Sequence, residues 1–385
     1  MISEDTLALA VRRAIISADQ RDRIVALATT PPPLATEMEP ATPGDEPMRL
    51  IGGGNDLFVT VGIVLLLSGS LFALQAVAGA NNAIVAAVLA GFIWPVAEFV
   101  TRQRRMRLSS TVLGLGFVAA ITTLIGIYLA GRPEMSGIDS PIEVAGLRPR
   151  AAFYALVAFG GVAAAAVVYF IRFRVPVMAA VLALAFTGAA FFFTTLFLYD
   201  GVVNGNVLMP TLEQVPDILA NALYVPLICG FIVFGTAVAL DLHDRERFTI
   251  WSDCAFWLHV ISAPLLVHPL FILATGQDVV FGRIEPGLSA SVMLGFLIAA
   301  FVYVALAIDR RSLLIPTLAY FGSLGIYYLV NSAANTTGIP PFALILLAIG
   351  ALIILFGAGW QNIRRLIVGS TLPTSVLKRL PPIKT

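Results

Sequence analysis

The sequence predicts an all-α membrane protein: a polytopic bundle of about ten transmembrane helices, built from helix hairpins, with both termini in the cytoplasm. Composition is the first reason. Apolar residues make up 58% of the chain and charged residues only 12%, whereas soluble domains average about a quarter charged. The apolar residues also gather in long segments, and the basic residues gather on one side of those segments.

Each apolar segment is roughly 18–25 residues long, which is enough for a helix to cross a hydrocarbon core about 30 Å thick. Lipid offers no hydrogen-bond partner to the backbone, and these segments do not alternate in polarity as membrane strands do. We therefore expect helices throughout. The predicted spans are 57–79, 83–100, 109–130, 151–171, 175–199, 218–240, 253–275, 288–308, 312–330 and 340–360.

The distribution of charge predicts the orientation of the chain. With the N-terminus inside, the inner stretches hold 20 of the 24 Lys and Arg residues. The outer loops hold only Arg132, Arg148, Arg150 and Arg283. Because cationic loops are retained on the cytoplasmic side, this bias places both termini inside.

Outside the spans, three segments have different characters. Residues 1–28 predict a short cytoplasmic helical hairpin, in which Ser17 and Gln20 form a capping box, and so small a unit must dock on a partner, on the bundle or on a second copy. The proline-rich residues 29–50 predict an extended linker. The bundle, residues 51–360, begins with Asn55 or Asp56 as a helix cap. The basic cytoplasmic tail, residues 361–385, suits anionic lipid.

A weak internal repeat runs through the bundle. The second, fourth, sixth and eighth predicted spans each end in a short basic turn, and the next span begins at once. The predicted unit is a tight two-helix hairpin closed at the cytoplasmic face. Any multi-span protein with cationic inner loops shares part of this pattern, so duplication and simple topology are both open. The basic turns are 102–105, 172–174, 244–247 and 309–311.

The seventh span carries the densest set of polar groups. Asp253, His259 and His268 lie in it together with Trp257 and two prolines, and ionisable groups inside a membrane are expensive enough to indicate function. Helical geometry places Asp253, Trp257, Pro264 and His268 on one face and His259 on another. A bent helix with two imidazoles favours a proton or cation route. The alternative is that both histidines only bond to neighbouring helices.

Other polar positions are weaker candidates. Glu98 lies one turn before Arg102, and an ion pair at the membrane surface accounts for it as well as a site does. Asp241 and Asp309 are interpreted as local ion pairs beside Arg245 and Arg310. The secondary candidates lie at the outer end of the ninth span: Tyr328, Asn331 and Asn335.

Several classes of chemistry have no motif here. The two cysteines, Cys229 and Cys254, lie in or beside predicted spans and predict neither a disulfide framework nor a thiolate metal site. Metal-binding, triad and phosphate-loop motifs are missing, so the sequence predicts no metal, no cofactor and no catalytic residue. Basic residues are scattered through surface loops, which does not favour nucleic-acid binding.

The overall plan resembles a group of bacterial inner-membrane proteins classed as a domain of unknown function. Those proteins have a short helical hairpin similar to residues 2–28, a proline-rich linker and eight to twelve spans. The segment 252–271, with Asp253, His259, Pro264 and His268, looks like their signature. The resemblance implies a multi-pass protein of the bacterial inner membrane, and it implies no particular activity.

Three functions are compatible with the sequence. The first is a transporter or permease-like protein for a small solute or ion, with proton coupling through His259 or His268. The second is a non-catalytic assembly or regulatory protein that recruits partners through residues 1–28. The third is a membrane-embedded enzyme that uses Asp253 and the histidines. A water-filled cavity at His259 would favour the transporter. An exposed docking face would favour the assembly protein, and a lateral opening would favour the enzyme.

Overall fold

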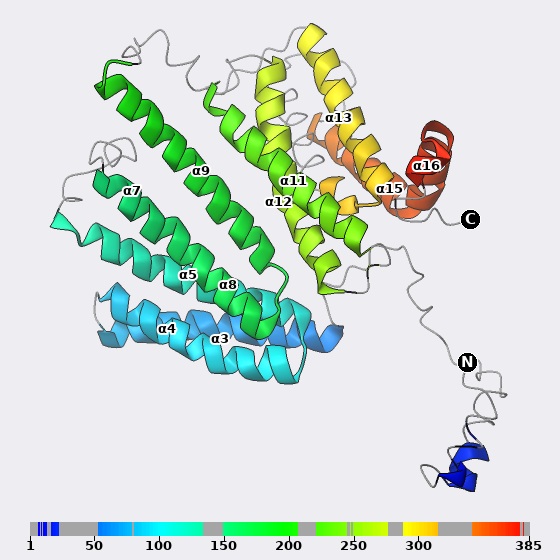
Figure 1. Ribbon diagram of the computed structural model, residues 1–385, viewed down its shortest axis with the longest axis horizontal. Helices are drawn as coiled ribbons and strands as arrows, with labels where there is room; N and C mark the ends of the chain where they lie inside the picture. Colours follow the sequence, from blue (N-terminus) through cyan, green and yellow to red (C-terminus); the bar gives the residue numbers. More distant parts are fainter. Residues whose placement is uncertain are drawn as a thin grey trace. The chain divides into compact units, whose positions relative to one another are not determined.

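In the described part of the chain every regular element is a helix (Figure 1). The computed structural model describes residues 7, 9, 11–13, 17–22, 53–78, 81–133, 149–206, 221–244, 247, 249–275, 288–314, 341–377 and 380. The chain divides into two compact units, Met1–Asp45 and Glu46–Thr385. We describe each unit by itself.

The N-terminal unit contains the predicted capping box. The backbone N–H of Ser17 donates to Gln20 Oε1 at 2.8 Å, and the N–H of Gln20 donates to Ser17 Oγ at 3.1 Å. This reciprocal pair satisfies two amides at the start of a helix, as the sequence predicted. The remainder of the predicted hairpin and the predicted linker, residues 29–50, lie outside the described residues.

Seven helical segments of the second unit are long and apolar enough to cross a membrane. They correspond to the first seven predicted spans, so the chain is a multi-pass membrane protein. The segments are Gly54–Ala78, Asn82–Gln103, Arg107–Ala130, Arg150–Phe173, Met178–Val203, Tyr224–His243 and Ile250–Leu270. In Figure 1 they belong to α3, α4, α5, α7 with α8, α9, α11 and α12.

Two further apolar helices coincide with the eighth and tenth predicted spans. They are α13 (Leu288–Ile308) and α15 (Pro341–Thr371). The predicted ninth span begins in the short 3-10 helix η6 (Arg311–Leu313), and residues 315–340 lie outside the described part. A total of about ten spans therefore stays a prediction. Because α15 continues past residue 360, the predicted boundary between bundle and tail falls inside one helix.

The helices pack as neighbouring hairpins. Helix α4 (Asn82–Ala97) packs against α5 (Arg107–Ala130), α8 (Gly161–Phe173) against α9 (Met178–Val203), and α11 (Tyr224–His243) against α12 (Ile250–Thr275). Large apolar side chains on α3 (Gly54–Ala78) face outward, including Phe58 and Phe72, which are 79% and 70% exposed. Such faces suit lipid, in which an exposed apolar side chain is not penalised.

Four connections between helices share one backbone feature. Among the described non-glycine residues, those with positive φ are Arg105, Arg174, Arg247 and Asp309, at 53° to 58°. Each lies in the turn that follows α4 with its π-helical extension, α8, α11 or α13. A left-handed residue reverses the chain sharply at a helix end. The basic turns after η1 and α8 are therefore short connections to α5 and α9, and duplication of the hairpin stays a prediction.

Local helix geometry departs from expectation in three places. Asp56 lies inside α3 and does not cap its own helix; its carboxylate accepts from the amides of Arg107, Leu108 and Ser109 at the start of α5. Helix α4 continues into a π-helix, η1 (Glu98–Gln103), just after Pro95. Helix α12 runs as one α-helix through both of its prolines.

Candidate functional site

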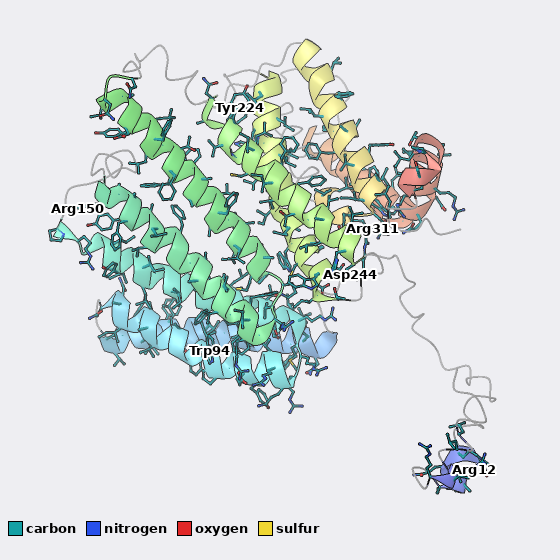
Figure 2. The ribbon with its side chains drawn as sticks, viewed as in Figure 1. Arg12, Trp94, Arg150, Tyr224, Asp244 and Arg311 are labelled. Atoms are coloured by element: carbon teal, nitrogen blue, oxygen red, sulfur yellow. The ribbon has the colours of Figure 1, made fainter. Side chains whose placement is uncertain are left out.

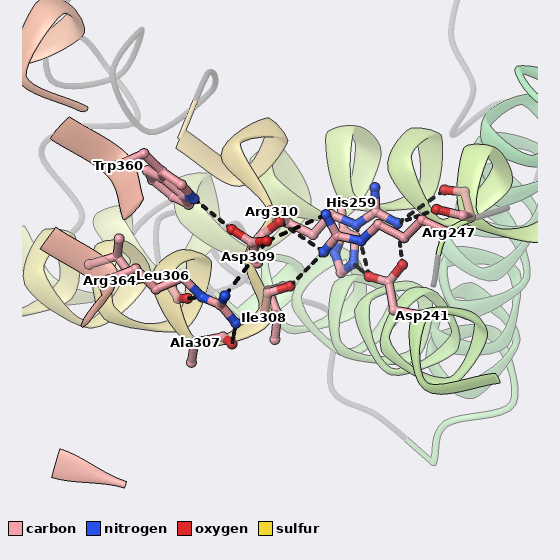
Figure 3. A network of polar contacts seen from close by, with 11 residues as sticks. Asp241, Arg247, His259, Leu306, Ala307, Ile308, Asp309, Arg310, Trp360 and Arg364 are labelled. Carbon is pink, nitrogen blue, oxygen red and sulfur yellow. Dashed lines mark hydrogen bonds and ion pairs between the residues drawn. The ribbon is translucent and has the colours of Figure 1, made fainter. Parts of the chain in front are cut away.

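The most concentrated polar feature of the described chain is a network of buried ionic side chains (Figure 3). It joins the ends of α11 and α13, the first half of α12 and the C-terminal half of α15. Its members are almost fully enclosed: His259 and Arg364 are 0% exposed, Arg310 and Asp309 2%, Arg247 4% and Asp241 6%. Burying so many charges is favourable only if they are paired, and each member has an ionic or hydrogen-bond partner within the network.

Asp241, on the last turn of α11, is the centre of one half of the network. Arg310 binds both of its carboxylate oxygens: Nε donates to Oδ2 at 3.0 Å, and Nη2 donates to Oδ1. His259 Nε2 on α12 lies 2.9 Å from the same Oδ2. Arg310 Nη2 also donates to the carbonyl and hydroxyl oxygens of Ser252, at 3.1 and 3.0 Å. One carboxylate therefore ties three segments together.

Asp309 is the centre of the other half. Its Oδ1 accepts a 2.6 Å hydrogen bond from Trp360 Nε1 on α15. Its Oδ2 lies 3.7 Å from Arg247 Nη1 and 3.8 Å from Arg364 Nη1, which are ion-pair distances. The indole of Trp360 in turn packs under Arg311, whose guanidinium carbon lies 5.4 Å from the ring centre.

The end of α13 explains why Asp309 and Arg310 point in these directions. The N–H of Arg310 donates to the carbonyl of Ala305 at 2.9 Å, and the N–H of Asp309 donates to that of Leu306 at 3.3 Å. This pair of bonds defines a Schellman motif, whose left-handed position is usually glycine. Here it is Asp309, with φ 57°. The turn sends the two successive side chains to opposite halves of the network.

Two arginines also cap the C-terminal end of α13. Arg247 Nη2 donates to the carbonyls of Ile308 and Asp309 at 3.1 and 2.9 Å. Arg364 Nε donates to the carbonyl of Leu306 at 2.9 Å. The last carbonyls of a helix have no partner within the helix and carry partial negative charge, so cations are stabilising there. Arg247 and Arg364 thereby lock α13 to the α11–α12 turn and to α15.

The structure sorts the predicted residues of α12 into two groups. His259 lies in the network, edge-to-face with Phe234 at 5.5 Å between ring centres. Asp253 and Trp257 are half-buried, whereas Pro264 and His268 are exposed. The face that the sequence singled out is thus the less buried one, and the histidine that joins the network is the one predicted to lie on a different face.

Outside α12, the predicted pair of Glu98 and Arg102 is confirmed, with Arg102 Nη1 donating to Glu98 Oε1 at 2.7 Å. Arg172 Nη2 from α8 donates to the same oxygen at 2.5 Å. The secondary candidates Tyr328, Asn331 and Asn335 lie outside the described residues.

The interpretation of Asp241 and Asp309 as local surface ion pairs was wrong. Both carboxylates are buried, and Asp241 pairs with Arg310 from 69 residues further along the chain. Arg364, predicted to face anionic lipid, is also buried. One pattern in the sequence indicates such long-range pairs. An acid at the end of one even-numbered span is matched by an arginine at the end of the next even-numbered span, as in Glu98 with Arg172. A charge pattern alone cannot distinguish a surface pair from a buried one.

The network brings an imidazole and a guanidinium group within hydrogen-bonding distance of one carboxylate. In the described residues, no group of three or more His, Cys, Asp or Glu side chains is placed to hold a metal ion. What the network offers is a carboxylate shared between a permanent cation and an imidazole, a group that titrates near neutral pH. Adding a proton there would change the charge that holds Arg310.

Comparisons of the chain with protein-family models, with curated proteins and with solved structures find no match. The class of protein therefore rests on the fold and the site: a multi-pass membrane protein, all-α in its described part, with a buried ionic network that joins four helices. The resemblance drawn from the sequence stays a prediction.

Proposed function

We propose that the protein is a proton-responsive, permease-like membrane protein for a small solute or ion, whose conformation is controlled by Asp241, His259 and Arg310. The observation that carries the proposal is the Asp241 carboxylate, which is buried and bound at once by a guanidinium and an imidazole from two other segments. Buried ionisable groups inside a membrane bundle mark proton relays and coupling sites in many pumps and transporters.

The physical argument concerns the charge on one carboxylate. When Asp241 is ionised, it accepts two charge-assisted bonds from Arg310 and holds the turn after α13 against α11. A proton on Asp241 removes the charge that balances Arg310 in a buried place. That loss favours an arrangement in which Arg310 separates from α11, and a two-state element of this kind is what proton coupling requires.

The contacts around Asp309 would hold α13 and α15 together when the bond between Asp241 and Arg310 breaks. Asp309 is bound by Trp360 and lies beside Arg247 and Arg364, and both arginines also bind carbonyls of α13. Helix α15 would therefore move with α13. Arg247 keeps the turn between α11 and α12 bound to the end of α13, so the expected motion rotates α11 and α12 relative to α13 and α15 about that turn.

Distance measurements across this boundary test the proposal. Spin labels at the exposed positions Leu242 on α11 and Leu366 on α15 should give different distance distributions in the wild type and in Asp241→Asn, at the same pH in lipid nanodiscs. The variant carries an uncharged side chain of similar size and represents the protonated carboxyl group. His243→Ala, an exposed neighbour, is the matched control and should keep the wild-type distribution.

Transport itself is tested in proteoliposomes that contain a trapped pH indicator and are exposed to a panel of sugars, amino acids, organic acids and monovalent cations. A solute that drives proton movement in the wild type and not in Asp241→Asn supports a permease. Identical distance distributions in the wild type and in Asp241→Asn, together with no solute-driven proton movement, would overturn the proposal.

A second function is favoured by the separate N-terminal unit. Residues Met1–Asp45 form a compact unit of their own, with the capping box of Ser17 and Gln20 inside it. A membrane protein that recruits a partner through residues 1–28 would be built in this way. Deleting residues 1–40 should then abolish its cellular role and leave the thermal transition of the membrane bundle unchanged in detergent. Loss of that transition would show that the unit belongs to the folded core.

A further inference from the structure

Exposed arginines gather in the two turns that follow α4 and α8. Arg102 is 57% exposed and Arg172 39% exposed at the side chain, and the neighbouring arginines are also classed as exposed. The group consists of Arg102, Arg104, Arg105 and Arg107 after α4 and of Arg172 and Arg174 after α8. These six residues form the arginine patch.

Glu98 brings the two halves of the arginine patch together. Its Oε1 accepts from Arg102 on the same helix and from Arg172 on α8, so the turn after α4 and the turn after α8 meet at one oxygen. Glu98 alone cannot neutralise Arg102, Arg104, Arg105, Arg172 and Arg174. In the described part of the chain, Arg105 and Arg174 have no carboxylate partner, and Arg104 lies over the ring of Phe99 at 5.3 Å.

An aromatic cluster holds the two turns rigidly in position. Trp94 on α4 packs edge-on against Phe173 at 5.0 Å and against Tyr169 at 6.1 Å, both on α8 (Figure 2). Phe117 on α5 stacks on Tyr169 at 5.2 Å. Because Phe173 lies between Arg172 and Arg174, this packing keeps the turn after α8 next to α4 before any ligand arrives.

The backbone adds a reason to expect a ligand for the side chains. Arg105 and Arg174 occupy left-handed positions, with φ of 53° and 55°, where glycine or asparagine is easier to accommodate. The first amides of α5 are not available to an anion, since Asp56 accepts from three of them. Recognition at this place therefore depends on guanidinium groups, which match phosphate oxygens in a bidentate manner.

We propose that the arginine patch binds the phosphate headgroup of an anionic phospholipid from the membrane in which the protein lies. The patch lies at the ends of apolar helices, where headgroups are found, and it carries an excess of positive charge on two adjoining turns. Basic pockets between helix ends are known to select anionic lipids over neutral ones. This site is separate from the network around Asp241 and does not depend on the proposed function.

Native mass spectrometry of the detergent-purified full chain tests the site. Dimyristoyl phosphatidylglycerol is the anionic probe and dimyristoyl phosphatidylcholine the neutral one. The wild type should bind the anionic lipid more tightly, and the variant R105N/R174N should lose about fivefold in affinity for each arginine removed. Asparagine tolerates the left-handed conformation, so this variant should keep the wild-type thermal transition.

Two controls separate the arginine patch from general charge. The variant R12N/R13N removes the same charge from the N-terminal unit and should bind the anionic lipid as the wild type does. The variant R105K/R174K keeps the charge without the bidentate guanidinium fork, and it should lose less affinity than R105N/R174N does. Equal binding of the two lipids by the wild type, or unchanged anionic-lipid binding in R105N/R174N, would overturn the proposal. Displacement of the lipid by inorganic phosphate alone would also overturn it, because the ligand would then be a soluble anion.

Discussion

Single side chains in this protein act over long distances in the sequence. Arg310 reaches Asp241 across 69 residues, and Trp360 reaches Asp309 across 51. Each bond joins a helix end to another helix, so it fixes the position of a whole element as well as its own turn. In a bundle where lipid and protein interiors are equally apolar, such bonds supply specificity that hydrophobic burial cannot.

The pair of Asp241 and Arg310 should behave as a buried ion pair. Replacing Arg310 by Met leaves the carboxylate buried beside His259 alone, and we expect a loss of about 3–5 kcal/mol in the free energy of unfolding. The double variant Asp241→Leu with Arg310→Met removes both charges and should recover most of that loss. Denaturant unfolding in detergent micelles measures both variants.

Arg365→Met is the control for this measurement, because Arg365 is an exposed arginine in the same region of α15 as Arg364. Its effect should stay within about 0.5 kcal/mol. If Arg310→Met is as stable as this control, the ion pair contributes nothing to holding the helices together.

Asp56 offers a second prediction for a single residue. Its carboxylate accepts from three backbone amides of α5 and from the hydroxyl of Ser109. Replacing it by Ala leaves these buried donors without an acceptor, and we expect a loss of about 2 kcal/mol in unfolding free energy. Asn55→Ala removes an exposed neighbour and should be nearly neutral. Equal thermal stability of the two variants would contradict the cap.

At the scale of elements, close helix approach depends on glycine. Gly230 on α11 lies where α12 passes: an added Cβ would come within 3.1 Å of the backbone carbon of Leu265 and within 3.0 Å of the Leu266 side chain. Gly235, one turn and a half further on, has nothing within 4 Å of that position. The two glycines of this helix therefore differ, because only Gly235 has room for a methyl group.

The two alanine variants should therefore change stability in opposite directions. Gly230→Ala forces the helices apart against a rigid backbone, and we expect a loss of about 1–3 kcal/mol. Gly235→Ala meets no obstacle and should gain up to about 1 kcal/mol, because alanine loses less backbone entropy in a helix. Thermal unfolding in the same detergent compares them. A loss of similar size in both would show that α11 and α12 do not meet at Gly230.

At the scale of the whole chain, the bundle repeats one arrangement. An acid near the end of one helix pairs with an arginine at the end of another, in Glu98 with Arg172 and in Asp241 with Arg310. The first pair is partly exposed and the second is buried. We propose a different role for each pair: the first belongs to a lipid-binding surface, and the second controls the conformation of the bundle.

Orientation in the membrane is a prediction for the whole molecule. The bias of basic residues predicts that reporters fused after Gly137 and Asn206 lie in the periplasm and that those after Arg105 and Lys384 lie in the cytoplasm. Alkaline phosphatase and green fluorescent protein fusions read the two sides. A cytoplasmic signal at Gly137 would require a different number of spans before it, and the predicted order of ten would then be wrong.

The sequence by itself determined the class of the protein and much of its architecture. Length and polarity of the apolar segments identify seven spans that the structure contains, because lipid leaves the backbone no alternative to helix. Local patterns were equally informative: Ser17 with Gln20, and Glu98 with Arg102, lie within one helical turn of each other, so spacing alone predicts their contact.

Only the tertiary structure decided the site. Which helix end meets which, and whether a charge faces solvent or another helix, depends on packing between segments that are far apart in the chain. For that reason the charge pattern alone predicts surface pairs at Asp241 and Asp309, and local sequence alone predicts Asn55 or Asp56 as a cap of its own helix. Periodicity could place His259 on a face of α12, yet it could not show that this face meets Asp241 and Arg310. Helical spacing fixes which side chains share a face, and only packing fixes what that face meets.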